Sequence, residues 1–235
     1  MRIITWNCNM AFRKKAPLIL ANKPDILIVP ECEHPSKLQP TLEFPKPNDT
    51  LWFGDNQNKG LGIFSFSNYR FQVLPSHNPE LQKIIPISVT GGEHDFTLFA
   101  IWAHNPKDKE GRYIEQVWKA IHYYGDQLTN TSAILIGDFN SNTIWDKQHK
   151  ERSHTNVVKL LAAKDIHSCY HHYYKKEQGN ELQPTLYMYR HQDKAYHIDY
   201  CFVSKDLLDK LQSVEVGEFE LWNQYSDHVP VIVTL

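Results

Sequence analysis

The stretch of sequence most informative about the fold is Ile134-Leu135-Ile136-Gly137-Asp138-Phe139-Asn140-Ser141, an apolar run that breaks at Gly137. Asp138 and Asn140 follow the break two residues apart, and in an extended backbone such residues point to the same side. A carboxylate and a carboxamide aimed together from a strand end can act on one anionic ligand. A strand that simply ends in an Asp/Asn turn is the alternative. Four other strand-like runs of this chain also end in polar residues of the same chemical kind.

Length and composition indicate an ordinary globular protein. The 235 residues are 41% hydrophobic, 22% charged and 12% aromatic, which suffices for an extensive core. We expect one domain over residues 1–235, and a monomer by default. No apolar run is long enough to cross a bilayer, and Met1–Trp6 enters a strand pattern at once, without the pattern of a signal peptide. We therefore expect a cytoplasmic protein with no membrane partner.

The net charge and the cysteines bear on two classes of function, non-specific DNA binding and cysteine-based metal or redox chemistry. The net charge of −2 lacks the basic footprint of a protein that binds DNA non-specifically, although a cluster of catalytic acids would lower the net charge of a protein with a local basic rim. The four cysteines, Cys8, Cys32, Cys169 and Cys201, show neither paired metal-ligand spacing nor a redox motif. We expect reduced, mostly buried thiols and no zinc site built on them.

The first 33 residues predict a parallel crossover unit. Residues 3–5 and 25–31 have strand patterns, and residues 13–23 between them have a helical pattern that Pro24 ends. This order brings the carboxyl ends of both strands together, with Asn7 and Glu31 close in space. Glu31 is a hard oxygen donor suited to Mg²⁺, and Glu33 is interpreted as solvated. An Asn-rich turn is the alternative for Trp6-Asn7-Cys8-Asn9.

The middle of the chain predicts further strands and two amphipathic helices. Strand patterns cover 51–53, 58–66, 84–89 and 96–102, the last two joined as a hairpin through Gly91-Gly92, and helical patterns cover 110–128 and 154–165. His104 lies where the 96–102 strand runs out into a loop. A lone histidine is more often structural, so this placement alone does not assign it a role.

Aromatic and cationic residues interleave at Cys169-Tyr170-His171-His172-Tyr173-Tyr174-Lys175-Lys176. Such a segment can stack on bases and meet phosphates, so Tyr170 and His172 are candidate substrate-binding residues, together with Tyr187 further on. A strand edge whose tyrosines pack on neighbouring residues explains the segment equally well, and the two interpretations stay open.

Two segments near the carboxyl end carry acids beside imidazoles. Asp199 is a carboxylate inside an otherwise apolar strand, and such a residue is rarely left without a partner. Asp227 and His228 stand immediately before a terminal strand, where a carboxylate that orients His228 would make it a usable general acid or base. A turn or helix cap before the strand is the alternative.

Five segments together resemble the endonuclease/exonuclease/phosphatase family in order and rough spacing: Trp6-Asn7-Cys8-Asn9, the strand ending at Glu31, Gly137-Asp138-Phe139-Asn140, His197-Ile198-Asp199-Tyr200 and Ser226-Asp227-His228. The resemblance covers essentially the whole chain. It implies an α/β fold of the DNase I type, a four-layer sandwich of two packed mixed β-sheets flanked by helices, with the site at one end of the sheets.

The resemblance also implies a metal site. When the family's metal ligands are assigned to the matching positions of this sequence, Glu31 would bind Mg²⁺ with help from Asn7 and Asp227. Mn²⁺ is the expected substitute. The family pattern usually has Gly after the second Asn, where this chain has Met10, so the first loop is expected to differ in shape.

The catalytic roles follow from the same resemblance. Asp138 would activate or orient the attacking water, Asn140 would hold the scissile phosphate, and Asp199 would orient His228, which contacts the phosphate or acts as a base. His104 stands where DNase I and several phosphatases have a histidine and where exonuclease III-like enzymes have a tyrosine. That departure argues against a pure abasic-site enzyme.

These observations predict a Mg²⁺-dependent phosphodiesterase, most simply a nuclease that hydrolyses DNA rather than RNA, as an endonuclease or an exonuclease. One alternative keeps the enzyme and changes the substrate to a small phosphoester, a nucleotide or a lipid headgroup, which the near-neutral charge and His104 favour. The other is a non-catalytic phosphate-binding module. It is disfavoured because every acid, amide and histidine that the mechanism calls for is present.

Overall fold

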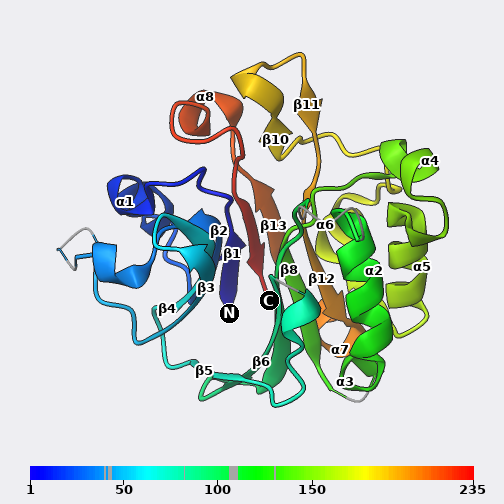
Figure 1. Cartoon of the computed structure of the whole chain (residues 1–235), viewed down its shortest axis with the longest axis horizontal. Coiled ribbons are helices and arrows are strands. Elements are labelled where there is room, and N and C mark those ends of the chain that lie inside the picture. Colours follow the sequence, from blue (N-terminus) through cyan, green and yellow to red (C-terminus); the bar gives the residue numbers. More distant parts are fainter. Residues whose placement is uncertain (40, 42–43, 82, 106–110, 130) are drawn as a thin grey trace.

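Two six-stranded β-sheets pack face to face in the computed structural model, which describes residues 1–39, 41, 44–81, 83–105, 111–129 and 131–235 (Figure 1). A small two-stranded sheet of β10 (Leu186–Tyr187) and β11 (Ala195–Tyr196) lies at one end of the molecule. Both termini lie side by side a little below the middle of the same view.

The first sheet contains the amino- and carboxyl-terminal strands and has the order β13-β14-β1-β2-β4-β3. Its strands are β1 (Arg2–Thr5), β2 (Ile26–Cys32), β3 (Asp49–Asn56), β4 (Lys59–Ser65), β13 (Ser213–Val216) and β14 (Val231–Thr234). β1 pairs with β2 in parallel, which confirms the predicted crossover unit. The 13–23 segment between them forms the short η1 (Phe12–Lys14) and α1 (Ala16–Leu20) in place of one continuous helix.

The second sheet has the order β5-β6-β7-β8-β12-β9. Its strands are β5 (Arg70–Val73), β6 (Ile84–Thr90), β7 (Phe96–Trp102), β8 (Ala133–Asp138), β9 (Ile166–Ser168) and β12 (Asp199–Ser204). β6 and β7 are antiparallel neighbours, so the predicted hairpin is confirmed, and β7 pairs with β8 in parallel.

Helices cover the outer faces of the two sheets. α1 lies outside the first sheet, and α2 (Ile114–Tyr123), α3 (Gly125–Thr129) and α5 (His154–Ala162) lie outside the second (Figure 1). The 110–128 helix is therefore divided into α2 and α3, and its expected first residue, Glu110, falls outside the described residues. Shorter helices complete the chain: α4 (Asp146–His149), α6 (Cys169–Tyr174), α7 (Lys205–Leu208), α8 (Phe219–Trp222), η2 (Pro35–Lys37), η3 (Pro79–Leu81), η4 (Thr143–Trp145), η5 (Lys150–Arg152) and η6 (Met188–Arg190).

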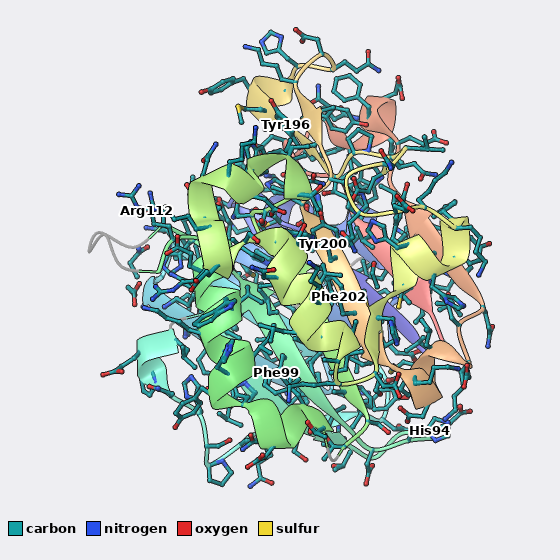
Figure 2. All side chains as sticks on the ribbon, turned by 90° about the vertical axis from the view of Figure 1, so that its right-hand side faces the viewer. His94, Phe99, Arg112, Tyr196, Tyr200 and Phe202 are labelled. Atoms are coloured by element: carbon teal, nitrogen blue, oxygen red, sulfur yellow. The ribbon has the colours of Figure 1, made fainter. Side chains whose placement is uncertain are left out.

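The core has a central layer between the sheets and an outer layer beneath the helices. Ile28 of the first sheet and Ile136 of the second belong to one buried cluster, so burial of apolar surface holds the two sheets together. Phe99, Tyr200 and Phe202 lie behind α2 and α5 in the outer layer (Figure 2). The result is the expected four-layer α/β sandwich of two mixed sheets. None of the helices among the described residues has the length and apolar character needed to span a bilayer.

Gly137 explains why the apolar run of β8 breaks where it does. Its φ of 144° lies in a region that other residues rarely adopt, and a Cβ there would lie 1.8 Å from the carbonyl oxygen of Ile101 on β7. Glycine thus permits the close approach of two strands immediately before Asp138. The close approach fixes the position of the carboxylate relative to the neighbouring strand.

Candidate active site

The candidate site lies where the predicted polar residues leave the sheets, at the end of the molecule that carries β10 and β11 (Figure 1). Parallel pairing of β1 with β2 and of β7 with β8 places four carboxyl ends there. Antiparallel pairing adds the amino ends of β12 and β14. Residues distant in sequence therefore meet at one end of the sandwich.

Asp138 is the centre of a buried hydrogen-bond network. Its Oδ2 accepts a bond from Asn7 Nδ2 at 3.0 Å and from Asn140 Nδ2 at 3.0 Å, while its Oδ1 accepts the backbone N–H of Asn140 at 2.8 Å. Asn140 has a φ of 48°, so the segment is an Asp/Asn turn rather than extended backbone. Asp138 and Asn140 therefore lie side by side, as the sequence predicts. The backbone that brings them together is the Asp/Asn turn and not the extended strand end on which the prediction was based.

Asp199 and His228 form the second half of the site. The Nδ1–H of His228 donates to Asp199 Oδ2 at 2.9 Å, and the Asp199 carboxyl group is fully buried. The other oxygen, Oδ1, has no hydrogen-bond partner among the described residues. Thr185 supports this pair, because its Oγ1 accepts the backbone N–H groups of Ile198 and Asp199 at 2.9 and 3.0 Å.

The two carboxyl groups and the imidazole are electrostatically linked. One ligand atom each of Asp138, Asp199 and His228 lies within 4.8 Å of the others. Burial and then the charge of Asp199 raise the pKa of Asp138 to about 7. Burial alone would lower the pKa of His228, but Asp199, with smaller contributions from Asp138 and Asp227, raises it to about 10. The site therefore keeps a cationic imidazole beside buried acids at neutral pH.

The predicted metal ligands supply oxygen atoms of the kind that Mg²⁺ prefers. Glu31 sits at an irregularity of β2 between Pro30 and Cys32, with a φ of 61°, and its side chain is 19% exposed and ion-paired to Lys59 at 3.0 Å. Asp227 Oδ1 accepts a hydrogen bond from Asn9 Nδ2 at 3.1 Å. The carboxylates of Glu31 and Asp227 and the Oδ1 of Asn7 fit a hard divalent cation in chemistry.

Glu33 is buried, although its side chain is interpreted from the sequence as solvated. The structure buries its carboxylate to 2% exposure and pairs it with the guanidinium of Arg13. A buried acid of this kind needs a partner, and Arg13 from η1 provides it. The ion pair joins η1 to the chain just beyond β2.

Tyr170 is not a surface platform for bases. The segment that contains it forms helix α6, neither a strand edge nor an exposed loop, and Ser168 caps the helix by accepting the His171 N–H. The Tyr170 ring is 2% exposed in the central core, and its hydroxyl contacts Gln183 at 2.5 Å. The burial of Tyr170 therefore supports a packing role rather than the predicted contact with substrate.

His172 lies away from the candidate site, whereas Tyr187 borders it, because its backbone N–H donates to the Asp227 carbonyl oxygen at 2.7 Å. His172 is exposed on α6. Slight burial and then the ammonium groups of Lys175 and Lys205 lower its pKa. Lys205 follows the carboxyl end of β12, whereas Asp199 begins that strand, so His172 lies near the end of β12 away from the site. The Tyr187 ring is buried and packs on Phe219 at 4.6 Å between ring centroids. Neither side chain presents the substrate surface that was expected.

His104 lies at the same end of the sheets as Asp138. Its ring stacks on Trp102 with centroids 5.4 Å apart, and burial lowers its pKa. The preceding residue, Ala103, accepts Asn140 Nδ2 through its carbonyl oxygen at 2.8 Å. His104 thus borders the Asp138–Asn140 turn, and its catalytic role stays a prediction.

A cavity of about 210 Å³ opens beside Asn140. Its lining combines aromatic and apolar residues with a few polar ones: Tyr113, Trp145, Gln148, Leu186, Met188 and Ile198. Leu186 forms a bridge with His228, so the lining is continuous with the acid–imidazole pair. Such a recess next to a candidate phosphate-binding amide can accommodate part of a substrate.

Sequence reasoning missed Thr185 and Lys59, which contact the predicted site residues directly. Thr185 has no distinguishing local pattern, because its role depends on the approach of two distant segments. Asn9 belongs to the predicted Trp6-Asn7-Cys8-Asn9 segment, and its backbone N–H donates to Asn7 Oδ1 at 3.1 Å, a turn typical of closely spaced asparagines.

Comparison with known proteins agrees with this geometry. The model of the Endonuclease/Exonuclease/phosphatase family matches residues 4–228, and the chain belongs to this family. A search of curated proteins found no match.

Solved structures share the fold at low sequence identity. An AP endonuclease from Archaeoglobus fulgidus is similar with a TM-score of 0.74 and 17% identity, covering 100% of this chain and 99% of that chain. A 3'-5' exonuclease (NExo) from Neisseria meningitidis gives 0.68 and 20%, with 100% and 99% covered. An AP endonuclease from Leishmania major gives 0.73 and 13%, with 99% and 86% covered. These likenesses confirm the DNase I-like sandwich.

Proposed function

We propose that this protein is a divalent-metal-dependent phosphodiesterase that hydrolyses DNA. The observation that carries the proposal is the buried assembly of Asp138, Asp199 and His228, flanked by the amides of Asn7 and Asn140. Family membership and similarity to two AP endonucleases and an exonuclease support a nuclease. One similar structure, a 3' phosphatase NExo from Neisseria, is bound to a product DNA hairpin.

The chain's own residues can carry the steps of hydrolysis. Asp138 would accept a proton from water as the water oxygen attacks phosphorus in line with the leaving oxygen, whose bond to phosphorus breaks. The Nδ2 of Asn140 donates to Asp138 and to the Ala103 carbonyl oxygen. On releasing one of these bonds it would, with the cationic His228, donate to the non-bridging phosphate oxygens, where negative charge develops. Asp199 would hold His228 in the orientation that this task needs.

The proposed metal is Mg²⁺, with Mn²⁺ as a substitute, held by Glu31, Asp227 and the Oδ1 of Asn7. A bound divalent cation supplies Lewis-acid stabilisation of phosphate charge. Glu31 would exchange its ion pair with Lys59 for the metal. We further propose one domain over residues 1–235, which the core shared by both sheets supports, and a cytoplasmic monomer.

A phosphatase or phosphodiesterase acting on a small phosphoester is the second candidate. His104 and the net charge of −2 favour it, because a small ester needs no basic groove. Tyr170 was a candidate for stacking on the bases of a polynucleotide. Because it lies buried in helix α6, it no longer supports a polynucleotide substrate.

A cleavage panel with added Mg²⁺ separates these functions. The substrates are intact duplex DNA, duplex with an abasic site, single-stranded DNA, RNA and bis(p-nitrophenyl) phosphate. Cleavage of a DNA substrate by the wild type, and its loss in Asp138→Asn, would support the nuclease. Turnover of the small ester alone would favour the second candidate, and no turnover of any substrate would contradict both.

A further inference from the structure

A second, larger cavity opens beside the candidate site, between the first sheet and the start of β6. Its volume is about 550 Å³, within the range of small-ligand pockets. Its wall includes Trp52 and Phe53 of β3, and His77, Pro79 and Lys83 complete it from the segment that leads into β6. None of these residues belongs to the acid–imidazole assembly described above.

Backbone pairing places this cavity on the active-site end of the second sheet. The Trp102 N–H donates to the carbonyl oxygen of Lys83 at 2.9 Å, and Trp102 is the register partner of Asp138 on β8. Lys83 and Asp138 therefore lie two strand spacings apart, a backbone separation of about 10 Å. Neighbouring nucleotides of an extended strand can span such a distance.

Charged and aromatic groups connect the cavity to the site. His104 stacks on Trp102, and its pKa, lowered mainly by burial, is lowered further by the nearby Lys83. Lys59 places its ammonium 5.4 Å from the centroid of a Trp102 ring while pairing with Glu31. Successive contacts therefore connect Glu31 through Lys59 and Trp102 to His104, which lies near Lys83 in the cavity wall.

Lys83 is suited to bind a phosphate at this position. Its side chain is only 13% exposed and pairs at 3.3 Å with Asp55, whose side chain is 87% exposed. An ion pair with so exposed a partner contributes little to stability, so a phosphate can replace Asp55 at small cost. The Phe53 ring, 5.9 Å from that of His77 between centroids, offers surface for stacking a base.

We propose that this cavity is a nucleotide subsite, in which Lys83 binds the phosphate of a nucleotide flanking the scissile phosphate and Phe53 contacts its base. The inference rests on the proposed function, because it extends the polynucleotide from that site. Asp55 then acts as the exchangeable partner that occupies Lys83 when no nucleotide is bound.

Binding of a short fluorescein-labelled DNA duplex to proteins that carry Asp138→Asn tests the subsite without cleavage. Lys83→Gln should weaken binding roughly tenfold and reduce the slope of log affinity against log salt by about one, the loss of one phosphate contact. Lys210→Gln, the same charge change after α7 at the other end of the sheets, should alter neither quantity. Lys83→Arg should restore binding, and Asp55→Asn should strengthen it.

Equal affinities and salt slopes for Lys83→Gln and Lys210→Gln would overturn the subsite. So would weaker binding of Lys83→Gln that Lys83→Arg does not restore, because a purely structural role would explain it. Hydrolysis of bis(p-nitrophenyl) phosphate, which carries one phosphate, reports the proposed function separately. We expect Lys83→Gln in the otherwise wild-type protein to hydrolyse it at the normal rate, and an equal loss on this ester would place Lys83 at the reacting phosphate instead.

Discussion

Asp138 and Asp199 are direct register partners on the antiparallel strands β8 and β12, and both carboxyl groups are completely buried. Two buried acids side by side repel each other when both are ionised, and a nearby cation relieves the repulsion. The imidazolium of His228, which hydrogen-bonds to Asp199, is that cation. The pairing of two strands thus sets both the geometry and the charge of the candidate site.

Removal of the Asp199 charge should lower the pKa of His228 in the metal-free protein. With the carboxylate present this pKa is about 10; in Asp199→Asn the lowering by burial is opposed only by the smaller contributions of Asp138 and Asp227, so the pKa of His228 should fall well below 10. NMR titration of the histidine ring nitrogens measures this directly. An unchanged His228 titration would show that Asp199 does not hold the imidazolium.

Thr185 should stabilise the site by satisfying two buried N–H groups. Thr185→Val keeps the shape of the side chain but leaves the N–H groups of Ile198 and Asp199 without a partner, so we expect a loss of roughly 2 kcal/mol or more in the free energy of unfolding. Urea denaturation measures the loss. Thr185→Ser retains the hydroxyl and should stay close to the wild type; an equally stable Thr185→Val would refute the role.

Acid should destabilise the fold through two buried histidines. Burial lowers the pKa of His154 and of His197 to about 4, whereas both take up a proton near pH 6.5 when unfolded. The unfolded state binds more protons at these two groups between these values, so the contribution of each histidine to stability is complete above about pH 6.5 and is lost as the pH drops towards 4. The full loss is roughly 3 kcal/mol for each histidine.

Urea unfolding at several pH values from neutral to acid measures this dependence. His154→Asn removes one of the two titrating groups, so the stability of this variant should depend less steeply on pH. A difference in stability between the wild type and His154→Asn that does not change over this range would contradict the assigned burial of His154.

Gly137 should not tolerate a side chain. Gly137→Ala combines an unfavourable φ with a Cβ inside the contact distance of the Ile101 carbonyl oxygen, so we expect a loss of about 3 kcal/mol or more in stability. Gly125→Ala is the matched control, because its Cβ would meet only the Lys164 ammonium at 3.5 Å. Similar melting temperatures for the two variants would show that the approach of β7 and β8 is looser than described.

Patterns local in sequence predicted the parts of the fold that depend on local rules. The parallel β1–β2 unit followed from strand, helix and strand order, and the β6–β7 hairpin followed from alternation around a glycine pair. The meeting of Asp138 with Asn140 was also predicted, although the positive φ of Asn140 was not.

The errors concern residues whose environment is set by distant packing. The tyrosines and histidines after Cys169 have a strand-like composition, but they form a helix that Ser168 caps. Tyr170 is buried in the core, where its hydroxyl contacts Gln183. Glu33 is buried because Arg13 reaches it from η1. Neither partner can be identified from spacing along the chain.

The most direct test of the proposed function is the rate of DNA cleavage with Mg²⁺ by Asp138→Asn, measured beside Asp209→Asn. Asp209 is an exposed acid paired with Lys205, and its substitution makes the same chemical change away from the site. We expect Asp138→Asn to cleave at least about 10²-fold more slowly with an unchanged melting temperature, and Asp209→Asn to match the wild type. Near-normal cleavage by Asp138→Asn would contradict the assignment of this site.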